Sequence, residues 1–450
     1  MTTHAPSRIE AFIDARPFTA FQRTLLILCF LVVAIDGFDT AAIGFLAPAI
    51  RAEWHVAAAA MAPLFGAGLF GLMTGALVFG PLADRFGRKT LLVATTAFFG
   101  LASLASMLAP DLQALVVLRF LTGLGLGGAM PNAITLTSEY CPRQRRSGLV
   151  TLMFCGFTIG SALGGLASAQ LLPVVGWRGV LALGGILPLL LVPVLALRLP
   201  ESLRFLVARQ RPQAQVLAIA RRLDPALPDS HRFVPDAASA ASPVRELFRG
   251  GMLGGTLLLW ATFFASLLIV YLVSSWTPTL LANIGVPLQR AALVTTMFQV
   301  GGTVGAIALG RLMDRFDPYR VLGLSYLCAA GFILLCATSA ASTGMLAAAI
   351  FGVGFCVSGS QVGVNALSAA YYPTSSRATG VSWSNAVGRC GSVLGSMAGG
   401  SMLAMNLGFQ AIFSSLAVPA VIAAAALTLM GVLSRRRARA GGLAPAGAER

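Results

Sequence analysis

The chain has 450 residues, of which 57% are hydrophobic and only 11% are charged, and its mean hydropathy is +0.81. Soluble domains carry about a quarter of their residues as charges, so this composition excludes a water-soluble globule and indicates an integral membrane protein. A net charge of +16 is typical of nucleic-acid binding in a soluble chain, but the positions of the basic residues point to membrane topology instead.

Twelve apolar stretches are each long enough for a helix that crosses a bilayer, which takes about 20 residues. We therefore expect an all-α membrane protein with twelve transmembrane helices. The 49 glycines favour close helix packing, and we interpret the runs Gly123–Gly128 and Gly156, Gly160 and Gly164 as packing surfaces. The predicted helices cover residues 24–50, 58–79, 91–109, 112–138, 148–172, 179–198, 251–281, 290–309, 321–339, 344–370, 379–403 and 409–433.

Basic residues are distributed very unequally between the two sides of these predicted helices. With both termini in the cytoplasm, 27 basic residues lie on the cytoplasmic side and three, Arg51, Arg178 and Arg290, on the other side. Loops rich in arginine and lysine stay in the cytoplasm during insertion. The sequence therefore predicts a multi-pass protein with both termini cytoplasmic, and it assigns the basic excess to topology.

Two motifs occur once in each half of the chain. Gly80-Pro-Leu-Ala-Asp-Arg-Phe-Gly-Arg-Lys89 recurs in part as Gly310-Arg-Leu-Met-Asp-Arg-Phe316, and the Pro142–Arg146 segment recurs as Pro373–Arg377. Parallel six-helix halves around a central cavity explain this repeat and are the arrangement of the major facilitator superfamily. The expected parts are an N-terminal half (1–198), a cytoplasmic linker (199–250), a C-terminal half (251–434) and a basic cytoplasmic tail (435–450).

Two carboxylates interrupt the first predicted helix, at Asp36 and Asp39. A charge at the bilayer centre costs at least about 2.5–3.5 kcal/mol, so each one needs a reason. Their spacing places both on one helical face, and neighbouring carboxylates resist ionising together, as a proton-coupling site requires. The alternative is a structural pair satisfied by neighbouring hydroxyls. Gly37 between them leaves room for another group to approach the backbone.

The fourth predicted helix carries Arg119 near its outer end and Glu139 near its inner end. Twenty residues of helix separate them by roughly 30 Å, so the two are not partners. By depth, Arg119 matches Asp39, and its planar guanidinium suits either that carboxylate or a substrate carboxylate. Glu139 is expected at the cytoplasmic mouth within reach of Arg85 or Arg88, where a simple surface ion pair is the alternative.

These motifs together resemble the aromatic acid:proton symporter family, a bacterial branch of the major facilitator superfamily. The resemblance rests on Asp36-Gly-Phe-Asp39, on Arg119 through Asn132 and on Glu139-Tyr-Cys-Pro142. It continues through Pro200-Glu-Ser-Leu-Arg204, Trp276-Thr-Pro278, Tyr371-Tyr-Pro373 and Gly388-Arg-Cys-Gly391, and so covers nearly the whole chain. It implies uptake of benzoate-like acids across the inner membrane.

The resemblance also implies roles for individual residues. Asp36, Asp39, Arg119 and Glu139 correspond to positions that the family needs for transport, and Arg119 is in addition a candidate substrate ligand. The implied cytoplasmic gate comprises Gly80, Asp84, Arg85, Gly87 and Arg88, with Asp314 and Arg315 in the second copy. Asp317 and Pro318 replace the Gly-Arg pair in that copy, so its half of the gate is expected to be weaker.

Substrate contacts are expected from polar and aromatic residues in the middle of helices. Rings favour stacking of an aromatic substrate, and amides suit a ring hydroxyl. The alternatives are lipid-facing or core positions for the aromatics and helix packing for the second arginine. Trp276 and Trp383 are predicted to anchor the membrane interface. The candidates are Phe38, Tyr271, Phe298, Gln299, Gln361, Asn365 and Arg389.

We therefore predict a monomeric, proton-coupled importer of an aromatic carboxylate, with membrane lipid around it and no nucleic-acid partner. Efflux of hydrophobic compounds by antiport and reception of aromatic acids are the alternatives. Seven irregularly spaced cysteines and three histidines give no disulfide framework and no zinc site. Without a visible nucleophile–base set or metal cluster, we expect neither an enzyme nor any cofactor besides the coupling proton.

Overall fold

The structure is a computed structural model that describes residues 7–234, 244–248, 252–339, 342–373 and 376–440. The chain forms two compact units. Unit 1 comprises Met1–Ala42 and Ala67–Ser239, and unit 2 comprises Ile43–Gly66 and Ala240–Arg450. Residues 199–234, which the sequence assigns to the linker, therefore lie in unit 1.

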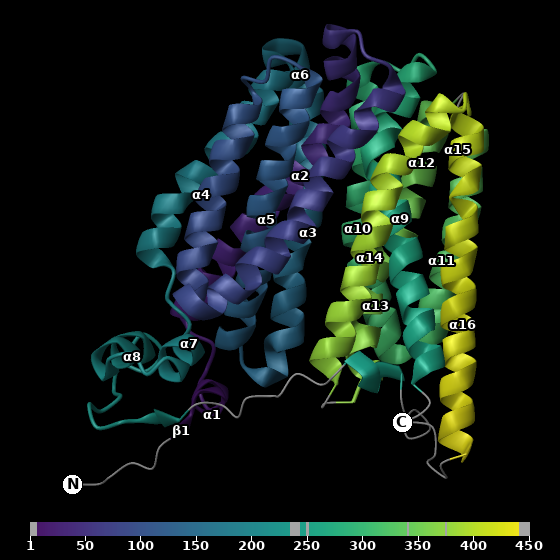
Figure 1. The fold of residues 1–450 in the computed structure, drawn as a ribbon. Coiled ribbons are helices and arrows are strands. Elements are labelled where there is room, and N and C mark those ends of the chain that lie inside the picture. The colour runs from purple at the N-terminus through teal and green to yellow at the C-terminus, as the bar shows by residue number, and fades with distance from the viewer. Residues whose placement is uncertain (1–6, 235–243, 249–251, 340–341, 374–375, 441–450) are drawn as a thin grey trace. The chain divides into compact units, whose positions relative to one another are not determined.

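Unit 1 contains the short N-terminal elements, the first long helices and the elements that follow them (Figure 1). Helix α4 packs on α5 and on α6. Helix α6 bends at Gly176, whose φ of 66° is in the left-handed region that favours glycine. The elements are β1 (Ser7–Arg8), α1 (Ile9–Asp14), α2 (Ala20–Trp54), α3 (Ala62–Phe86), α4 (Arg88–Ser106), α5 (Leu112–Tyr140), α6 (Arg143–Arg198), α7 (Leu203–Ala208), α8 (Gln213–Ala220) and β2 (Phe233–Val234).

Unit 2 also takes in the C-terminal end of α2 and the first residues of α3. Helix α9 packs on α14 and α16, and α10 packs on α12 and α13. A single π-helical turn joins α12 to α13. The elements are η1 (Ala58–Met61), η2 (Val244–Phe248), α9 (Leu253–Asn283), α10 (Leu288–Arg315), α11 (Pro318–Thr338), α12 (Thr343–Val353), η3 (Gly354–Ser358), α13 (Gly359–Tyr371), α14 (Arg377–Ala404), α15 (Phe409–Ser415) and α16 (Ala417–Ala440).

The long helices correspond to the twelve predicted ones. Among the described residues, ten helical segments are long and apolar enough to cross a membrane. Helix α6 counts once in that number although it covers two predicted helices on either side of Gly176, and α14 is not in it. Large apolar side chains such as Leu77, Val174 and Leu197 are more than three-quarters exposed, which suits contact with lipid.

The glycine runs pack helices together, as the sequence predicts. A Cβ atom at Gly123 or Gly127 of α5 would overlap with the carbonyl oxygen of Gly68 or Leu72 in α3. Glycine alone allows backbones to approach this closely. Trp276, by contrast, is not an interface anchor: its indole is fully buried and donates to the carbonyl oxygen of Ser396 at 2.7 Å. The packing of α9 against α14 encloses it.

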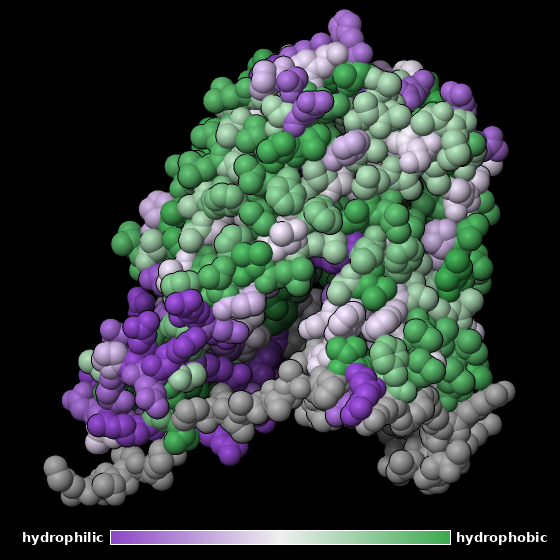
Figure 2. Space-filling model, in the orientation of Figure 1, coloured by the Kyte–Doolittle hydropathy of each residue, from purple (hydrophilic) through white to green (hydrophobic). Residues whose placement is uncertain are grey.

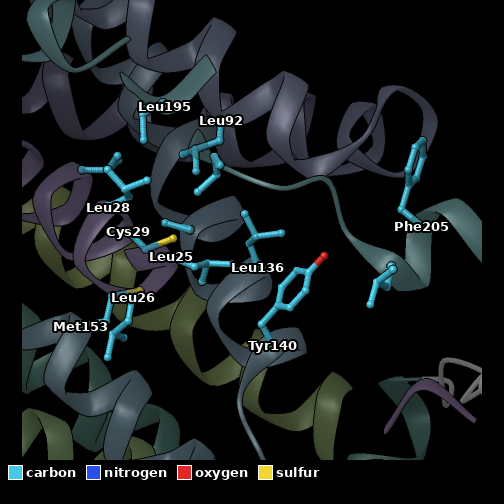
Figure 3. Packing of buried hydrophobic residues seen from close by; sticks show 14 of the residues in the cluster. Leu25, Leu26, Leu28, Cys29, Leu92, Leu136, Tyr140, Met153, Leu195 and Phe205 are labelled. Atoms are coloured by element: carbon cyan, nitrogen blue, oxygen red, sulfur yellow. The ribbon is translucent and has the colours of Figure 1, made fainter. Parts of the chain in front are cut away.

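A polar cap, defined as residues 7–16 and 199–234, belongs to unit 1. Hydrophilic side chains gather over α7 and α8, whereas the long helices present hydrophobic ones (Figure 2). Strands β1 and β2 pair in parallel, and the apolar face of α1 (Ile9, Phe12 and Ile13) is buried. Those three side chains join the core cluster that contains Leu25, Leu136 and Phe205 (Figure 3). The cap is therefore anchored on the helices of unit 1.

Candidate functional site

The centre of the candidate site is a buried ion pair between α2 and α5. Asp39 is 1% exposed and Arg119 is 3% exposed. Nη2 of Arg119 lies 2.5 Å from Oδ2 of Asp39, and Nη1 lies 3.2 Å from Oδ1, so the contact is bidentate. This is the partner that helix depth indicated for Arg119. Asp111 fixes the start of α5 by accepting the backbone N–H of Ala114 at 2.8 Å.

Hydroxyl groups complete the surroundings of both aspartates. Ser103 of α4 donates to Oδ1 of Asp39 at 2.8 Å, and Thr40 donates to Oδ1 of Asp36 at 3.1 Å. Asp36 is fully buried. Sequence reasoning missed Ser103, although a polar residue in the apolar stretch 91–109 is a signal of the right kind. Ion pairing and hydroxyl contacts occur together. The geometry therefore fits both a proton-coupling pair of carboxylates and a structural pair satisfied by neighbouring hydroxyls.

Helix α6 lies directly on the segment of α2 that carries the two aspartates. A Cβ atom at Gly37 would overlap with the carbonyl oxygen of Phe157, and one at Gly160 would overlap with that of Ala34. Ser161 donates its hydroxyl to the carbonyl oxygen of Gly37 at 2.9 Å. The group that approaches Gly37 is thus the backbone of α6, which fixes how Asp36 and Asp39 are presented.

Glu139 is separate from this pair and lies beside the first motif loop (residues 80–89). Its carboxylate is buried, with Oε1 3.6 Å from Nε of Arg88, while Arg88 also pairs with Asp84 at 2.8 Å. Arg88 is thus the predicted partner that Glu139 contacts, and burial argues against a simple surface ion pair. Arg85 is exposed and its guanidinium lies over the ring of Phe86.

The segment after α6 closes over the same loop. Oε1 of Glu201 accepts the backbone N–H of Lys89 at 3.1 Å, and the carbonyl oxygen of Glu201 accepts the Tyr140 hydroxyl at 2.5 Å. Arg209 donates to the carbonyl oxygen of Asp84 at 2.8 Å and 3.2 Å. The loop is therefore held by residues that sequence reasoning placed in the linker.

The second copy of the loop, in unit 2, is built differently. Asp314 and Arg315 are exposed at the end of α10. The Asp317 side chain caps α11 by accepting the backbone N–H groups of Tyr319 and Arg320, with Pro318 in the first turn. Aspartate followed by proline is a strong signal for a helix start. Asp317 and Pro318, which replace the Gly-Arg pair of the first copy, thus serve locally to start α11.

In unit 2, several polar candidates for substrate contact form hydrogen bonds, whereas the aromatic candidate Phe298 packs in the core. Arg389 of α14 donates to the Tyr271 hydroxyl of α9 at 3.2 Å, and Gln299 lies 3.4 Å from the Ser274 hydroxyl. Asn365 donates to the carbonyl oxygen of Gln361 one turn earlier in α13. Phe298 is fully buried in the packing of α10, which fits the core position left open as an alternative. Phe38, next to Asp39 in unit 1, is buried as well.

Within the described residues there is no group of three or more His, Cys, Asp or Glu side chains arranged to hold a metal ion. The side chains that make up the site are carboxylates, guanidinium groups and hydroxyls. Such groups can hold an anion and can take up or release a proton.

Comparisons with known proteins agree with the motifs. A family model described as Major Facilitator Superfamily matches residues 29–292 and 259–449. The 4-hydroxybenzoate transporter PcaK of Pseudomonas aeruginosa is 46% identical over 430 residues, which are 95% of this chain and 96% of that protein. The gallate transporter of Pseudomonas putida is 44% identical over 429 residues, again 95% and 96%.

A solved structure shows the same fold. The inward open conformation of the xylose transporter XylE from E. coli superimposes with a TM-score of 0.71 at 19% identity, over 90% of this chain and 95% of that one. The predicted fold class is thereby confirmed. With its long helices, repeated motif loops and the identity to full-length relatives, the chain belongs to the major facilitator superfamily and, within it, to the aromatic acid:proton symporter family that its motifs resemble.

Proposed function

We propose that this protein imports an aromatic carboxylate together with protons by alternating access. Its relatives of 44–46% identity are named as transporters of 4-hydroxybenzoate and gallate, which are hydroxylated benzoates. The observation that carries the mechanism is the buried, bidentate contact of Arg119 with Asp39. Membrane transporters hold such intramembrane charges at ion and substrate pathways.

The ion pair provides a means of coupling. A buried guanidinium without an anionic partner is strongly unfavourable, so Arg119 needs either ionised Asp39 or another anion. When Asp39 takes up a proton, its attraction for Arg119 falls, and the carboxylate of the substrate becomes the better partner. Arg119 then binds that carboxylate bidentately, as guanidinium groups do. Proton and substrate anion therefore bind together.

The remaining roles follow from this scheme. Asp36, one helical turn from Asp39, is the second candidate for the coupled proton. Phe38 and, in unit 2, Tyr271, Gln299 and Arg389 are proposed substrate contacts, because their rings and polar groups suit a hydroxylated ring. One proton with one monoanion carries no net charge, so dependence of uptake on membrane voltage would indicate more than one proton.

We further propose that the protein resides in a bacterial inner membrane with both termini in the cytoplasm. The 27 to three distribution of basic residues supports this orientation. On this assignment the polar cap and the loop of residues 80–89 face the cytoplasm. We propose that the protein acts as a monomer with the proton as its coupling ion, and that it is not an enzyme.

Uptake by cells that express the chain tests the proposal. Labelled 4-hydroxybenzoate, gallate, benzoate, protocatechuate, phthalate and nicotinate are compared with and without an uncoupler, and 4-hydroxybenzyl alcohol serves as a competitor without a carboxylate. We expect accumulation of at least one hydroxybenzoate, abolished by the uncoupler and unaffected by the alcohol. Exclusion of these compounds from cells, or binding without accumulation, would overturn the proposal.

Substitution of the central carboxylate tests the mechanism. Asp39→Asn should abolish gradient-driven accumulation because the amide cannot carry the proton. Asp111→Asn is the matched control: its exposed side chain caps α5, and asparagine keeps that cap. Accumulation by Asp39→Asn at the rate of the control would show that the coupling site lies elsewhere.

A further inference from the structure

We propose that Ser103 is a positioning residue for proton uptake at Asp39: it donates to the ionised carboxylate and accepts from the protonated one. This inference rests on the proposed function, because it assumes that Asp39 carries the coupled proton. It adds a residue of α4 that neither the motifs nor the charge pattern indicated.

The hydroxyl of Ser103 lies between two possible hydrogen-bond acceptors. Its Oγ is 2.8 Å from Oδ1 of Asp39 in α2 and 3.5 Å from the carbonyl oxygen of Leu181 in α6. Ser103 is fully buried, and Asp39 and Leu181 are each 1% exposed. A buried polar group needs a protein partner in every state that it adopts, because leaving it unsatisfied is costly.

A serine hydroxyl can satisfy both protonation states of a neighbouring carboxyl group. It has one hydrogen to donate and two lone pairs with which to accept. When Asp39 is ionised, Ser103 donates to Oδ1. When Asp39 is protonated, the acid O–H has Ser103 Oγ as an acceptor, and the serine hydrogen turns toward the carbonyl oxygen of Leu181. Only a rotation about the C–O bond of the serine is required.

Besides Ser103, charged and polar groups from α2, α5 and α6 lie near Asp39. Arg119 of α5 is in contact with Asp39: its Nη1 lies 3.2 Å from Oδ1, the oxygen to which Ser103 also donates. Asp36 lies one turn earlier on α2 itself, and α6 contributes the Leu181 carbonyl and Gly184. When Arg119 turns to a substrate anion, Ser103 remains as a hydrogen-bond partner of Asp39. It therefore influences how readily Asp39 releases its proton.

Helix α6 limits the space beside these oxygens. A Cβ atom at Gly184 would lie 3.3 Å from Oδ1 of Asp39 and 3.4 Å from Oγ of Ser103. These are tight contacts, so the backbone of α6 at Gly184 closes one side of the pair. A small hydroxyl side chain with two orientations fits this space.

The test is the pH dependence of the initial uptake rate of 4-hydroxybenzoate by Ser103→Ala and Ser103→Thr. Alanine removes a donor to the ionised carboxylate, so the protonated form persists to higher pH. Hydrogen bonds to charged groups correspond to about one to two pH units. We expect the pH of half-maximal uptake to rise by that amount in Ser103→Ala and to stay near the wild-type value in Ser103→Thr.

Ser106→Ala is the matched control, because Ser106 is a fully buried serine of the same helix. Its hydroxyl donates to the carbonyl oxygen of Ala102 at 2.9 Å within α4, so its loss should leave the pH profile unchanged. A wild-type profile in Ser103→Ala, or an equal shift in Ser106→Ala, would overturn the proposal.

If Ser103→Ala does not fold, Ser103→Cys takes its place. A thiol is a weak donor, so the profile should shift in the same direction by less, and an unshifted profile overturns the proposal. The proposed function fails separately, when wild-type uptake is insensitive to the uncoupler. When uptake is coupled and Asp39→Asn abolishes it, an unshifted Ser103 variant refutes only the role of Ser103.

Discussion

Gly87 leaves room for the carboxylate of Glu201, because a Cβ atom at residue 87 would overlap with Oε2 of that glutamate. The same glycine has a φ of +102°, which L side chains rarely adopt. Glu201 in turn accepts the backbone N–H of Lys89 at the start of α4. One glycine thus joins the loop of residues 80–89 to the segment that follows α6.

Gly87→Ala should therefore destabilise the protein. The unfavourable φ alone corresponds to about 1–3 kcal/mol, and displacement of Glu201 adds to it. Thermal unfolding of the purified protein in detergent measures the loss. Gly80→Ala in the same motif is the control, since its added Cβ would have no described atom within 4 Å beyond its chain neighbours and the adjacent backbone of its own helix. Equal unfolding temperatures of the two variants would contradict the role of Gly87.

The contact of Asp39 with Arg119 should show strong coupling in a double-mutant cycle. Arg119→Gln leaves a buried carboxylate without its cation, which typically costs about 3–5 kcal/mol. Adding Asp39→Asn removes that carboxylate charge, so the double variant should be more stable than Arg119→Gln alone. Unfolding free energies of the four proteins give the coupling energy. If the effects of the two substitutions on the free energy of unfolding are additive, the ion pair does not contribute to stability.

Glu10 should stabilise the polar cap fully at neutral pH and progressively less in acid. A hydrogen bond from Arg143, aided by Arg146, lowers the pKa of Glu10 from 4.5 to about 2. A lowered folded-state pKa gives stability that is complete above pH 4.5 and disappears as the pH falls toward 2. Glu10→Gln should therefore lower the unfolding temperature equally at pH 6 and pH 8, and by less at pH 3.

The control for Glu10 is Asp229→Asn, also in the polar cap. Asp229 pairs with Arg221 at 2.6 Å, but its side chain is 87% exposed, and exposed ion pairs contribute about 0–1 kcal/mol. Asp229→Asn should therefore change the unfolding temperature only slightly at pH 3, 6 and 8. A Glu10→Gln effect that persists undiminished at pH 3 would indicate that lost packing, not lost charge, is responsible.

Close contact of α6 with α2 should make Gly160 intolerant of any side chain. The added methyl group of Gly160→Ala would overlap with the carbonyl oxygen of Ala34, and backbone cannot rotate away as a side chain can. We expect poor yield of folded protein and loss of uptake. Gly148→Ala lies earlier in the same helix, and its added Cβ would have no described atom within 4 Å beyond its chain neighbours and the adjacent helix backbone, so it should behave as wild type. Normal uptake by Gly160→Ala would contradict this packing.

Hydropathy and charge reveal the membrane fold because a bilayer requires about 20 mainly apolar residues in every helix that crosses it. The apolar stretches, the repeated loops around Asp84 and Asp314, and the intramembrane Asp36, Asp39 and Arg119 can all be read from the chain alone. Local signals also explain the helix start at Asp317, whose side chain caps α11. Each of these features depends on neighbouring residues or on the solvent.

Contacts between distant segments could not be derived in this way. Ser103 and Asp39 are 64 residues apart, and Glu201 reaches Lys89 across 112 residues; only the packing of helices on one another brings them together. The same packing buries Trp276, which its position near the end of a predicted helix had placed at the membrane interface. The sequence by itself determined which segments lie in an apolar solvent and which charges need partners. The tertiary structure decided the partners, because helices of one period can pack in many registers and side-chain fit selects among them.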